Sequence, residues 1–381
     1  MPKPFALSLV LAWFAGLLVC PSLFRVAQPF LAAPALAAPD LASVGARVGL
    51  IAAKKKAPPS DRVKGLLEKA ERGDPEAQYA LGYLHSRGEE VDFDQKEAAA
   101  WYLKAAEQNH ELSQYLLGEM YYKGVGVARD RAQAAQWYQK AAEKGQRQAQ
   151  FMLGVIYAYG HGLPEDQSQA AEWFLRAAEK GHVEAQYGVG VRYATGHGLS
   201  RDPQKATQWF EKAAEQGHPL SQYNVGVAHL EGQGVPKDYG KAAAWYEKAA
   251  EQGVDSAQYS LGQLYEKGLG LEPDQTRAAK WYERAAERGN VEAQHDLALM
   301  YDEGRGVARD PAKAALWQTR AADQGHAQAQ YLLAKRYDLG HGVEPSIAQA
   351  QAYLTQSAEQ GHPEAQRLLE IGGFSDYRRG H

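Results

Sequence analysis

The feature that most constrains this chain is an internal period of 36 residues. A Gln recurs at that interval at Gln78, Gln114, Gln150, Gln186, Gln222, Gln258, Gln294, Gln330 and Gln366. A Trp recurs at the same interval at Trp101, Trp137, Trp173, Trp209, Trp245, Trp281 and Trp317, and Tyr353 stands at the next place. Because the spacing never slips, the sequence predicts a stack of repeats in which each unit depends on its neighbours for stability.

Each unit has the pattern of two antiparallel helices. In the second unit, Ala134, Trp137 and Ala141 have the spacing of one apolar helical stripe, so the Trp at this position is predicted to be a structural core residue. Gly124 is placed to end the first helix in the left-handed conformation. Asp130 is placed to cap the second helix. Every unit is therefore expected to be a helix-turn-helix.

Several units carry a Gly in the middle of the first helix, where Gly costs about 1 kcal/mol relative to Ala. These glycines are Gly118, Gly154, Gly190, Gly226 and Gly262. A cost that recurs needs a packing reason. We expect either the close approach of a neighbouring helix or contact with the Trp ring.

The period fixes the predicted boundaries. The eight units are 75–110, 111–146, 147–182, 183–218, 219–254, 255–290, 291–326 and 327–362. Residues 62–74 are predicted to form an N-terminal capping helix, because Val63, Leu66 and Ala70 have helical spacing. A C-terminal capping helix is predicted over 363–371, followed by a tail over 372–381.

The N-terminus, residues 1–37, has the composition of an export signal. Lys3 precedes an apolar stretch from Phe5 to Val19, and Ala35-Leu36-Ala37 has the small-x-small pattern of a cleavage site. Residues 4–24 are alternatively long enough to remain as an uncleaved membrane anchor. Either way, we expect the repeats to be exported.

Residues 38–61 are predicted to be a flexible leader between the signal and the repeats. The only cysteine, Cys20, lies within the signal, so the mature chain has no disulfide and no thiol chemistry. The expected location is the periplasm, or secretion from a bacterium. Contact with the membrane is expected only through the N-terminal segment, if it is not cleaved.

The motif A-x-x-x-L-G-x-x-Y-x-x-G-x-G-V-x-x-D-x-x-x-A-x-x-W-Y-x-x-A-A-x-x-G is nearly complete in residues 257–289, where Leu271 stands at the Val position, and nearly complete in 113–145. It closely resembles the Sel-one-like (Sel1) repeat family, relatives of the tetratricopeptide repeats. The resemblance implies an all-α fold, a right-handed α/α solenoid of eight helix-turn-helix repeats with capping helices, whose first helices line a concave surface. It also implies a role as a scaffold or adaptor that binds other proteins, often in the bacterial envelope or the endoplasmic reticulum.

Motifs that carry catalytic chemistry are not found in the sequence. It has no G-x-S-x-G, no Walker loop and no H-E-x-x-H. Eight of the 12 His residues recur at two turn positions, which favours capping or solvated roles over metal binding. The net charge of −4, with mixed signs, argues against a nucleic-acid partner. We therefore expect no enzymatic activity, no metal and no cofactor.

Partner choice should depend on the residues that differ between units, because the recurring residues are needed for folding. One strip of the first helix varies freely from unit to unit. The candidate partner-binding residues on it are Leu116, Glu119, Lys123, Met152, Val155, Tyr159, Val191, Thr195, Asn224, Val227, Glu231 and Gln263. We expect this strip to bind a peptide or protein segment.

Two alternatives remain open at this stage. The first is a module that binds an envelope polymer such as peptidoglycan or polysaccharide. The second is weak β-lactam hydrolysis, to which some relatives with this repeat have been linked. Those relatives are rich in disulfides, whereas this array contains no cysteine.

Overall fold

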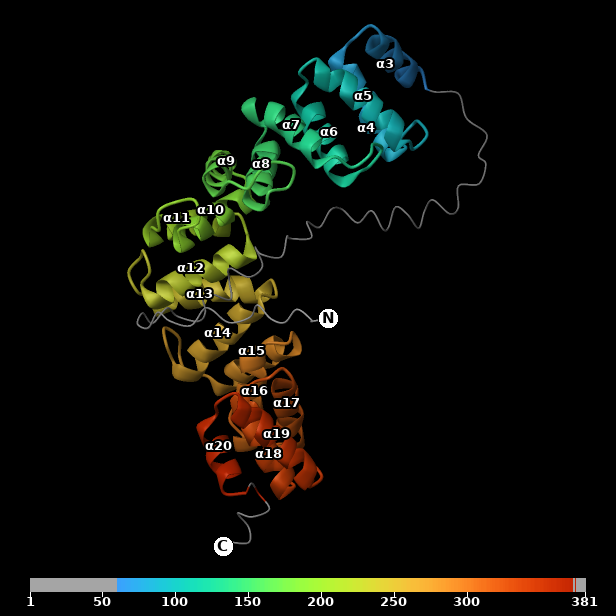
Figure 1. Ribbon diagram of the computed structural model, residues 1–381. Coiled ribbons are helices and arrows are strands. Elements are labelled where there is room, and N and C mark those ends of the chain that lie inside the picture. The colour runs from blue at the N-terminus through green and yellow to red at the C-terminus, as the bar shows by residue number, and fades with distance from the viewer. Residues whose placement is uncertain (1–59, 373, 375–381) are drawn as a thin grey trace, which may run out of the picture. The chain divides into compact units, whose positions relative to one another are not determined.

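The computed structural model describes residues 60–372 and Phe374. The predicted export signal, all but the end of the predicted leader, and most of the predicted tail lie outside the described residues. Within the described part, every regular element is an α-helix (Figure 1). None of the described helices is long and apolar enough to span a membrane.

The helices alternate between first and second members of each unit. The first helices are α4 (Pro75–Arg87), α6 (Glu111–Lys123), α8 (Arg147–Tyr159), α10 (Val183–Thr195), α12 (Pro219–Glu231), α14 (Asp255–Lys267), α16 (Val291–Glu303) and α18 (Ala327–Leu339). The second helices are α5 (Gln95–Glu107), α7 (Arg131–Glu143), α9 (Gln167–Glu179), α11 (Pro203–Glu215), α13 (Tyr239–Glu251), α15 (Gln275–Glu287), α17 (Pro311–Asp323) and α19 (Ile347–Glu359). The helix α3 (Asp61–Glu71) precedes them and α20 (Pro363–Glu370) follows.

Each helix packs chiefly against the helix before it and the helix after it in the chain. Figure 1 shows this as pairs that follow one another from α4 to α19. The prediction of an all-α solenoid of repeated helix pairs is therefore confirmed.

The mid-helix glycines have a specific packing partner, which is the aromatic residue that follows the Trp. A Cβ added at Gly190 would lie 2.5 Å from a ring carbon of Phe210, and one at Gly226 would lie 2.6 Å from the ring of Tyr246. The same contact occurs at Gly82, Gly118, Gly154 and Gly262. The glycine thus lets the second helix of its own unit approach closely, and the ring involved is not the Trp.

In the last two units, both the mid-helix residue of the first helix and the residue that faces it on the second helix differ. Ala298 and Ala334 replace the mid-helix Gly. The residues at the aromatic position are then Gln318 and Leu354, and both are fully buried. A bulkier residue on the first helix is accompanied by a smaller, non-aromatic one on the second, as close packing requires.

The seven Trp residues lie on the second helices with unequal burial. Trp101, Trp137, Trp173 and Trp317 are buried, whereas Trp209, Trp245 and Trp281 are partly exposed. In each of these seven units a Lys or Arg three residues later lies over the indole, at 3.8 Å from the ring centroid for Lys212 on Trp209. One face of the ring is therefore covered by a cation, an interaction of about 0.5–1 kcal/mol at exposed sites.

The recurring Gln joins consecutive units. In each case its side-chain amide donates to a carbonyl near the end of the preceding second helix, as Gln186 Nε2 does to Ala178 O at 3.1 Å. The last carbonyls of a helix have no partner within the helix. The Gln supplies a second donor to this carbonyl, which for Ala178 also accepts from the backbone N–H of Gly181 at 2.9 Å, and the residue is buried at every place except Gln366.

The turn residues have the capping roles that the sequence predicts. Asp130 accepts from the backbone N–H of Gln133 at 2.9 Å, and equivalent aspartates cap the other second helices except α19, which Ser346 caps. His182 caps α10 through Nδ1, which accepts from Ala185 N at 3.2 Å. The inter-unit histidines His110, His182, His218 and His326 cap a first helix in this way, and His362 caps α20. These His residues are thus part of the fold.

The first unit differs from the others in its second loop residue. In the second unit this residue is Gly126, and a Cβ there would lie 2.1 Å from the carbonyl oxygen of Gln95. In the first unit it is Glu90, which adopts a positive φ of 59°. Its carboxylate accepts from the Ser60 hydroxyl at 2.7 Å and pairs with Arg62. A side-chain contact with the start of α3 therefore replaces the close backbone contact.

Candidate partner-binding surface

The candidate residues lie on consecutive first helices, α6 to α14, and differ in exposure. Lys123 and Thr195 are exposed. Those that are partly exposed are Leu116, Glu119, Val155, Tyr159, Val191, Glu231 and Gln263. Three are buried, namely Met152, Asn224 and Val227. The face available to a partner is thus formed mainly by the partly exposed members of the strip.

Side chains of neighbouring first helices contact one another along this strip. Met152 and Val155 of α8 belong to one apolar cluster with Tyr115 and Tyr122 of α6. The Tyr122 hydroxyl lies 3.1 Å from Nδ1 of His161, in the loop after α8. The strip is therefore continuous from one unit to the next.

Some candidate residues already have partners within the chain. Glu119 accepts from the hydroxyl of Tyr138 at 2.6 Å and forms an ion pair with Lys123. Burial and the Glu119 carboxylate raise the pKa of Tyr138 well above its ordinary value. These two candidates are held in place by the fold, so they would present a fixed charge pair to a partner.

The strip becomes polar where α14 meets α16. The hydroxyl of Tyr259 donates to Asp296 Oδ2 at 3.0 Å and accepts from Gln263 Nε2 at 2.9 Å. Burial raises the pKa of Asp296 to about 6. Tyr259 was missed as a candidate because it stands one position before the variable strip, although the ring at this position recurs from Tyr79 onwards.

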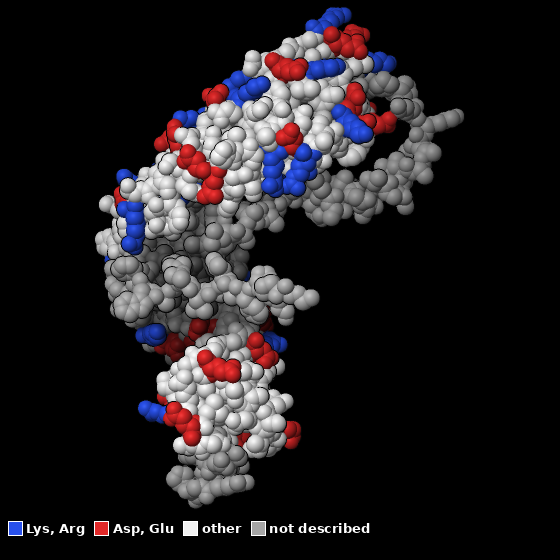
Figure 2. All heavy atoms as spheres, in the orientation of Figure 1, with Lys and Arg blue, Asp and Glu red and all other residues white. Residues whose placement is uncertain are grey.

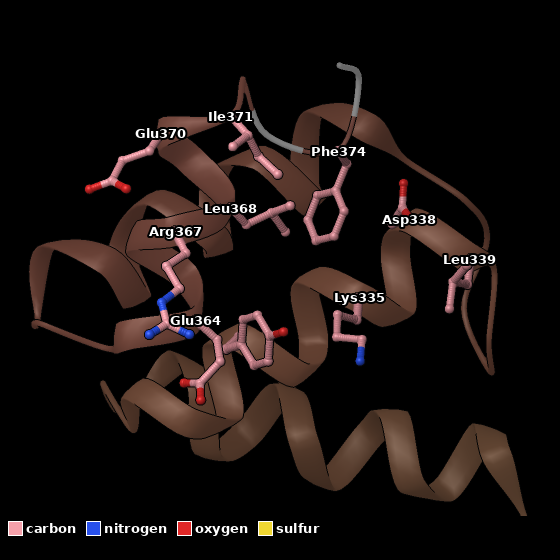
Figure 3. Close-up of a pocket in the computed structure, with 10 residues that line it drawn as sticks. Lys335, Asp338, Leu339, Glu364, Arg367, Leu368, Glu370, Ile371 and Phe374 are labelled. Carbon is pink, nitrogen blue, oxygen red and sulfur yellow. The ribbon is translucent and has the colours of Figure 1, made fainter. Parts of the chain in front are cut away.

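The strip ends in a pocket of about 630 Å³ between α18 and α20 (Figure 3). Figure 3 shows Leu368 and Phe374 on one side of the pocket and Lys335 on the other. The lining also includes Tyr331, Asp338, Leu339, Glu364, Arg367, Glu370 and Ile371. Leu339 and Ile371 are among the most exposed large apolar side chains of the described residues. The pocket is therefore the apolar end of the same first-helix face.

Charges of both signs are distributed over the surface. In Figure 2, Lys and Arg lie interspersed with Asp and Glu on the face shown. Within the described residues, no group of three or more His, Cys, Asp or Glu side chains is placed to hold a metal ion. The described surface therefore carries polar and charged side chains that another molecule could contact.

Two buried arginines on the first helices were also missed from the sequence. Arg192 and Arg336 occupy one position of the repeat. The other units carry Leu84, Met120, Ile156, Ala228, Leu264 and Met300 there. The signal that could have revealed them is a charged residue at a position that is otherwise apolar.

The comparisons with known proteins agree with this architecture. The family model for the Sel1 repeat matches residues 75–110, 112–146, 147–182, 183–218, 219–254, 255–290, 291–326 and 327–362. A comparison with curated protein sequences gives no match.

Two solved structures are similar over most of the chain. One is the crystal structure of c5321, a protective antigen present in uropathogenic Escherichia coli strains and displaying an SLR fold. It has 38% identity and a TM-score of 0.75, with 82% of this chain and 68% of that chain covered. The other is a Sel1 repeat protein from Oxalobacter formigenes, with 30% identity, a TM-score of 0.63, and coverage of 84% and 95%. With the family model matched in all eight units, the chain belongs to the Sel1 repeat family.

Proposed function

We propose that this protein is an exported scaffold or adaptor that binds a peptide or protein segment on its first-helix face. Sel1 repeat proteins generally mediate protein–protein interaction, and the family is generally non-catalytic. We infer export, the kind of partner and the binding face from the residues of this chain.

The proposal rests on one observation: within each unit, the residues that maintain the fold are separate from the residues that a partner can reach. The residues that recur have contacts inside the chain: Gln186 bonds the preceding helix, Gly190 admits the ring of Phe210, and Asp202 caps α11. The residues that vary, such as Val155 and Val191, lie partly exposed on consecutive first helices. Partner choice needs side chains that are both variable and accessible.

The composition of the strip supports a protein partner over a polymer of sugars. Its central members are Val155, Tyr159 and Val191, and all three are partly exposed. Partly exposed apolar and aromatic side chains in adjacent rows are typical of surfaces that bind an apolar anchor of another protein. The flanking pair of Glu119 and Lys123 provides a polar rim.

Adding like charges to this face tests the proposal. We expect Val155→Glu with Val191→Glu to abolish capture of the partner identified by cross-linking in cells, because burying the two carboxylates at an interface is costly. The matched control is Gln136→Glu with Gln208→Glu, on exposed positions of α7 and α11. Both proteins should keep the helicity of the wild type. Equal capture by the two variants would exclude the first-helix face.

Export is tested separately at the N-terminus. If the signal is cleaved, N-terminal sequencing of protein from a membrane-free extracellular or periplasmic fraction should begin near Ala38. An intact N-terminus on protein in the membrane fraction would identify the anchored form. Recovery of intact protein in the cytosol would contradict export.

A further inference from the structure

The buried arginines on the first helices differ in one respect that points to a ligand. Arg192 is 7% exposed and Arg336 is 5% exposed. A buried guanidinium is costly unless it is both hydrogen-bonded and paired with a negative charge. The two sites can be compared directly, because they are the same position of the repeat in different units.

Arg336 has a carboxylate partner from its own chain. Its Nη2 pairs with Asp302, which lies near the end of the preceding first helix, α16. Its Nη1 lies 3.4 Å from the carbonyl oxygen of His341 in the following loop. The side chain of Asp302 is 22% exposed, so this ion pair lies at the edge of the surface. This position of the repeat can therefore accommodate a carboxylate beside the buried guanidinium.

Arg192 has no such partner among the described residues. The position that corresponds to Asp302 is Ala158. Arg192 Nη1 donates to Gln167 Oε1 at 3.0 Å and to the carbonyl oxygen of His197 at 3.1 Å, and both acceptors are neutral. Burial lowers the pKa of Arg192 to about 10. The guanidinium is thus hydrogen-bonded but not neutralised by the described part of the chain.

The surroundings of Arg192 add aromatic rings and further positive charge. Tyr159 lies partly exposed at the end of α8, and its ring lies 5.7 Å from that of His161. His161 lies 3.1 Å from the Tyr122 hydroxyl, and the guanidinium carbon of Arg131 is 5.7 Å from the Tyr122 ring. A row of cations and rings therefore crosses the ends of α6, α8 and α10.

An acid on this edge, Glu165, is linked to the guanidinium through the side-chain amide of Gln167. Glu165 accepts from Gln167 Nε2 at 2.9 Å, while Gln167 Oε1 accepts from Arg192. The amide therefore stands between the two charges. It orients Arg192 without supplying a negative charge.

We propose that Arg192 receives a carboxylate from an acidic peptide segment of the partner, laid across the ends of α6, α8 and α10. The partner's carboxylate occupies the place that Asp302 has beside Arg336. Tyr122 and Tyr159 contact the residues that flank the acid. This inference rests on the proposed function and specifies the chemistry of the partner segment.

The probe is a fluorescein-labelled peptide of alternating Glu and Tyr with an amidated C-terminus, measured by fluorescence anisotropy at low salt. The reference peptide has Gln in place of every Glu. A third peptide is the Gln form with a free C-terminal carboxylate. It distinguishes recognition of Glu side chains from recognition of the C-terminal carboxylate. We expect the wild type to bind at least one carboxylate-bearing peptide about tenfold more tightly than the reference.

Substitutions at equivalent repeat positions provide the matched variants. Ala158→Asp supplies the acid internally, as Asp302 does, and should remove the preference while preserving the fold. Ala194→Asp places the same acid one unit later, where the facing residue is Ala228, and should leave the preference unchanged. Arg192→Met, the residue type found at Met120 and Met300, should also remove it, with little risk to folding.

Three results would overturn the inference. They are equal binding of all peptides by the wild type, an unchanged preference in both Ala158→Asp and Arg192→Met, and complete displacement of the peptide by millimolar inorganic phosphate. None of these results would decide whether the natural partner needs Val155 and Val191. Failure of the acid preference is therefore distinguishable from failure of the proposed function.

Discussion

The pairing of a mid-helix Gly with an aromatic ring makes a quantitative prediction. Gly190 faces Phe210, whose ring carbons lie 2.5 and 2.6 Å from the place of an added Cβ. Carbon atoms in contact normally lie about 3.5–4.0 Å apart. Phe210 is 6% exposed, so its ring has little room to move. Gly190→Ala must therefore displace the ring or separate α10 from α11.

The magnitude follows from two opposing effects. Overpacking of a core by one methyl group typically costs about 1–3 kcal/mol. The better helix propensity of Ala returns about 1 kcal/mol. The single variant should therefore lose about 0–2 kcal/mol, a range too wide to be decisive. The coupling between the two positions is more informative.

The last repeat supplies the compensating pair. Ala334 faces Leu354 there, so Ala and Leu are compatible at these positions. Phe210→Leu alone should cost about 1–2 kcal/mol through lost apolar burial. In the double variant, Gly190→Ala with Phe210→Leu, the added methyl group fills the space left by the ring. We expect the total cost to be about 1–2 kcal/mol less than the sum of the two single costs.

The assay must resolve local stability, because a repeat array need not unfold in one step. Hydrogen exchange of α10 and α11 amides, together with urea unfolding followed by circular dichroism, meets this need. Gly65→Ala is the control, since no heavy atom lies within 4 Å of an added Cβ in α3. It should stabilise the protein by up to about 1 kcal/mol. Additive costs, or equal stabilisation by Gly190→Ala and Gly65→Ala, would refute this account of the packing.

Three further predictions concern the other recurring residues. Trp137→Ala should cost more stability than Trp209→Ala in thermal unfolding, because Trp137 is buried and Trp209 is partly exposed; the reverse order would contradict the assignment. Gln186→Leu should cost about 1–3 kcal/mol in urea unfolding, because it removes both the hydrogen bond to Ala178 O and the one accepted from Gln216 Nε2; no change would contradict the role of Gln186 in joining the units. His182→Asn should make stability less sensitive to acid. Burial lowers the pKa of His182 from 6.5 to about 4, so between these values the unfolded chain binds a proton that the folded chain does not, and stability falls with falling pH. Parallel pH profiles of urea midpoints for the wild type and this variant would contradict that role.

The fold could be predicted from the sequence because local and long-range signals repeat in one register. Asp130 as a cap and Gly124 as a left-handed helix end each follow from the residues around them. The partner of the mid-helix Gly was only half predictable. Because Gly destabilises a helix, its recurrence in mid-helix predicts that another residue packs closely against it. Whether that residue is the Trp or the one after it depends on how the second helix is rotated about its axis.

The site was less predictable, because burial depends on how consecutive units pack. The variable strip could be located, yet Met152 and Val227 prove buried while Val155 and Val191 remain partly exposed. The importance of Arg192 also needs the structure. Only the contact between Arg336 and Asp302 shows that a residue of the preceding unit faces this position.

Site-specific photocross-linking tests the central claim, that the first-helix face holds the partner. A photoreactive residue would replace Val155 or Val191 on the first helices, and Gln136 or Gln208 on exposed faces of the second helices. Irradiation of the full-length protein in its own cells, followed by mass spectrometry, would identify the adducts. We predict adducts with the same protein from both first-helix positions and none from the second-helix positions. Adducts only from the second-helix positions would contradict the account.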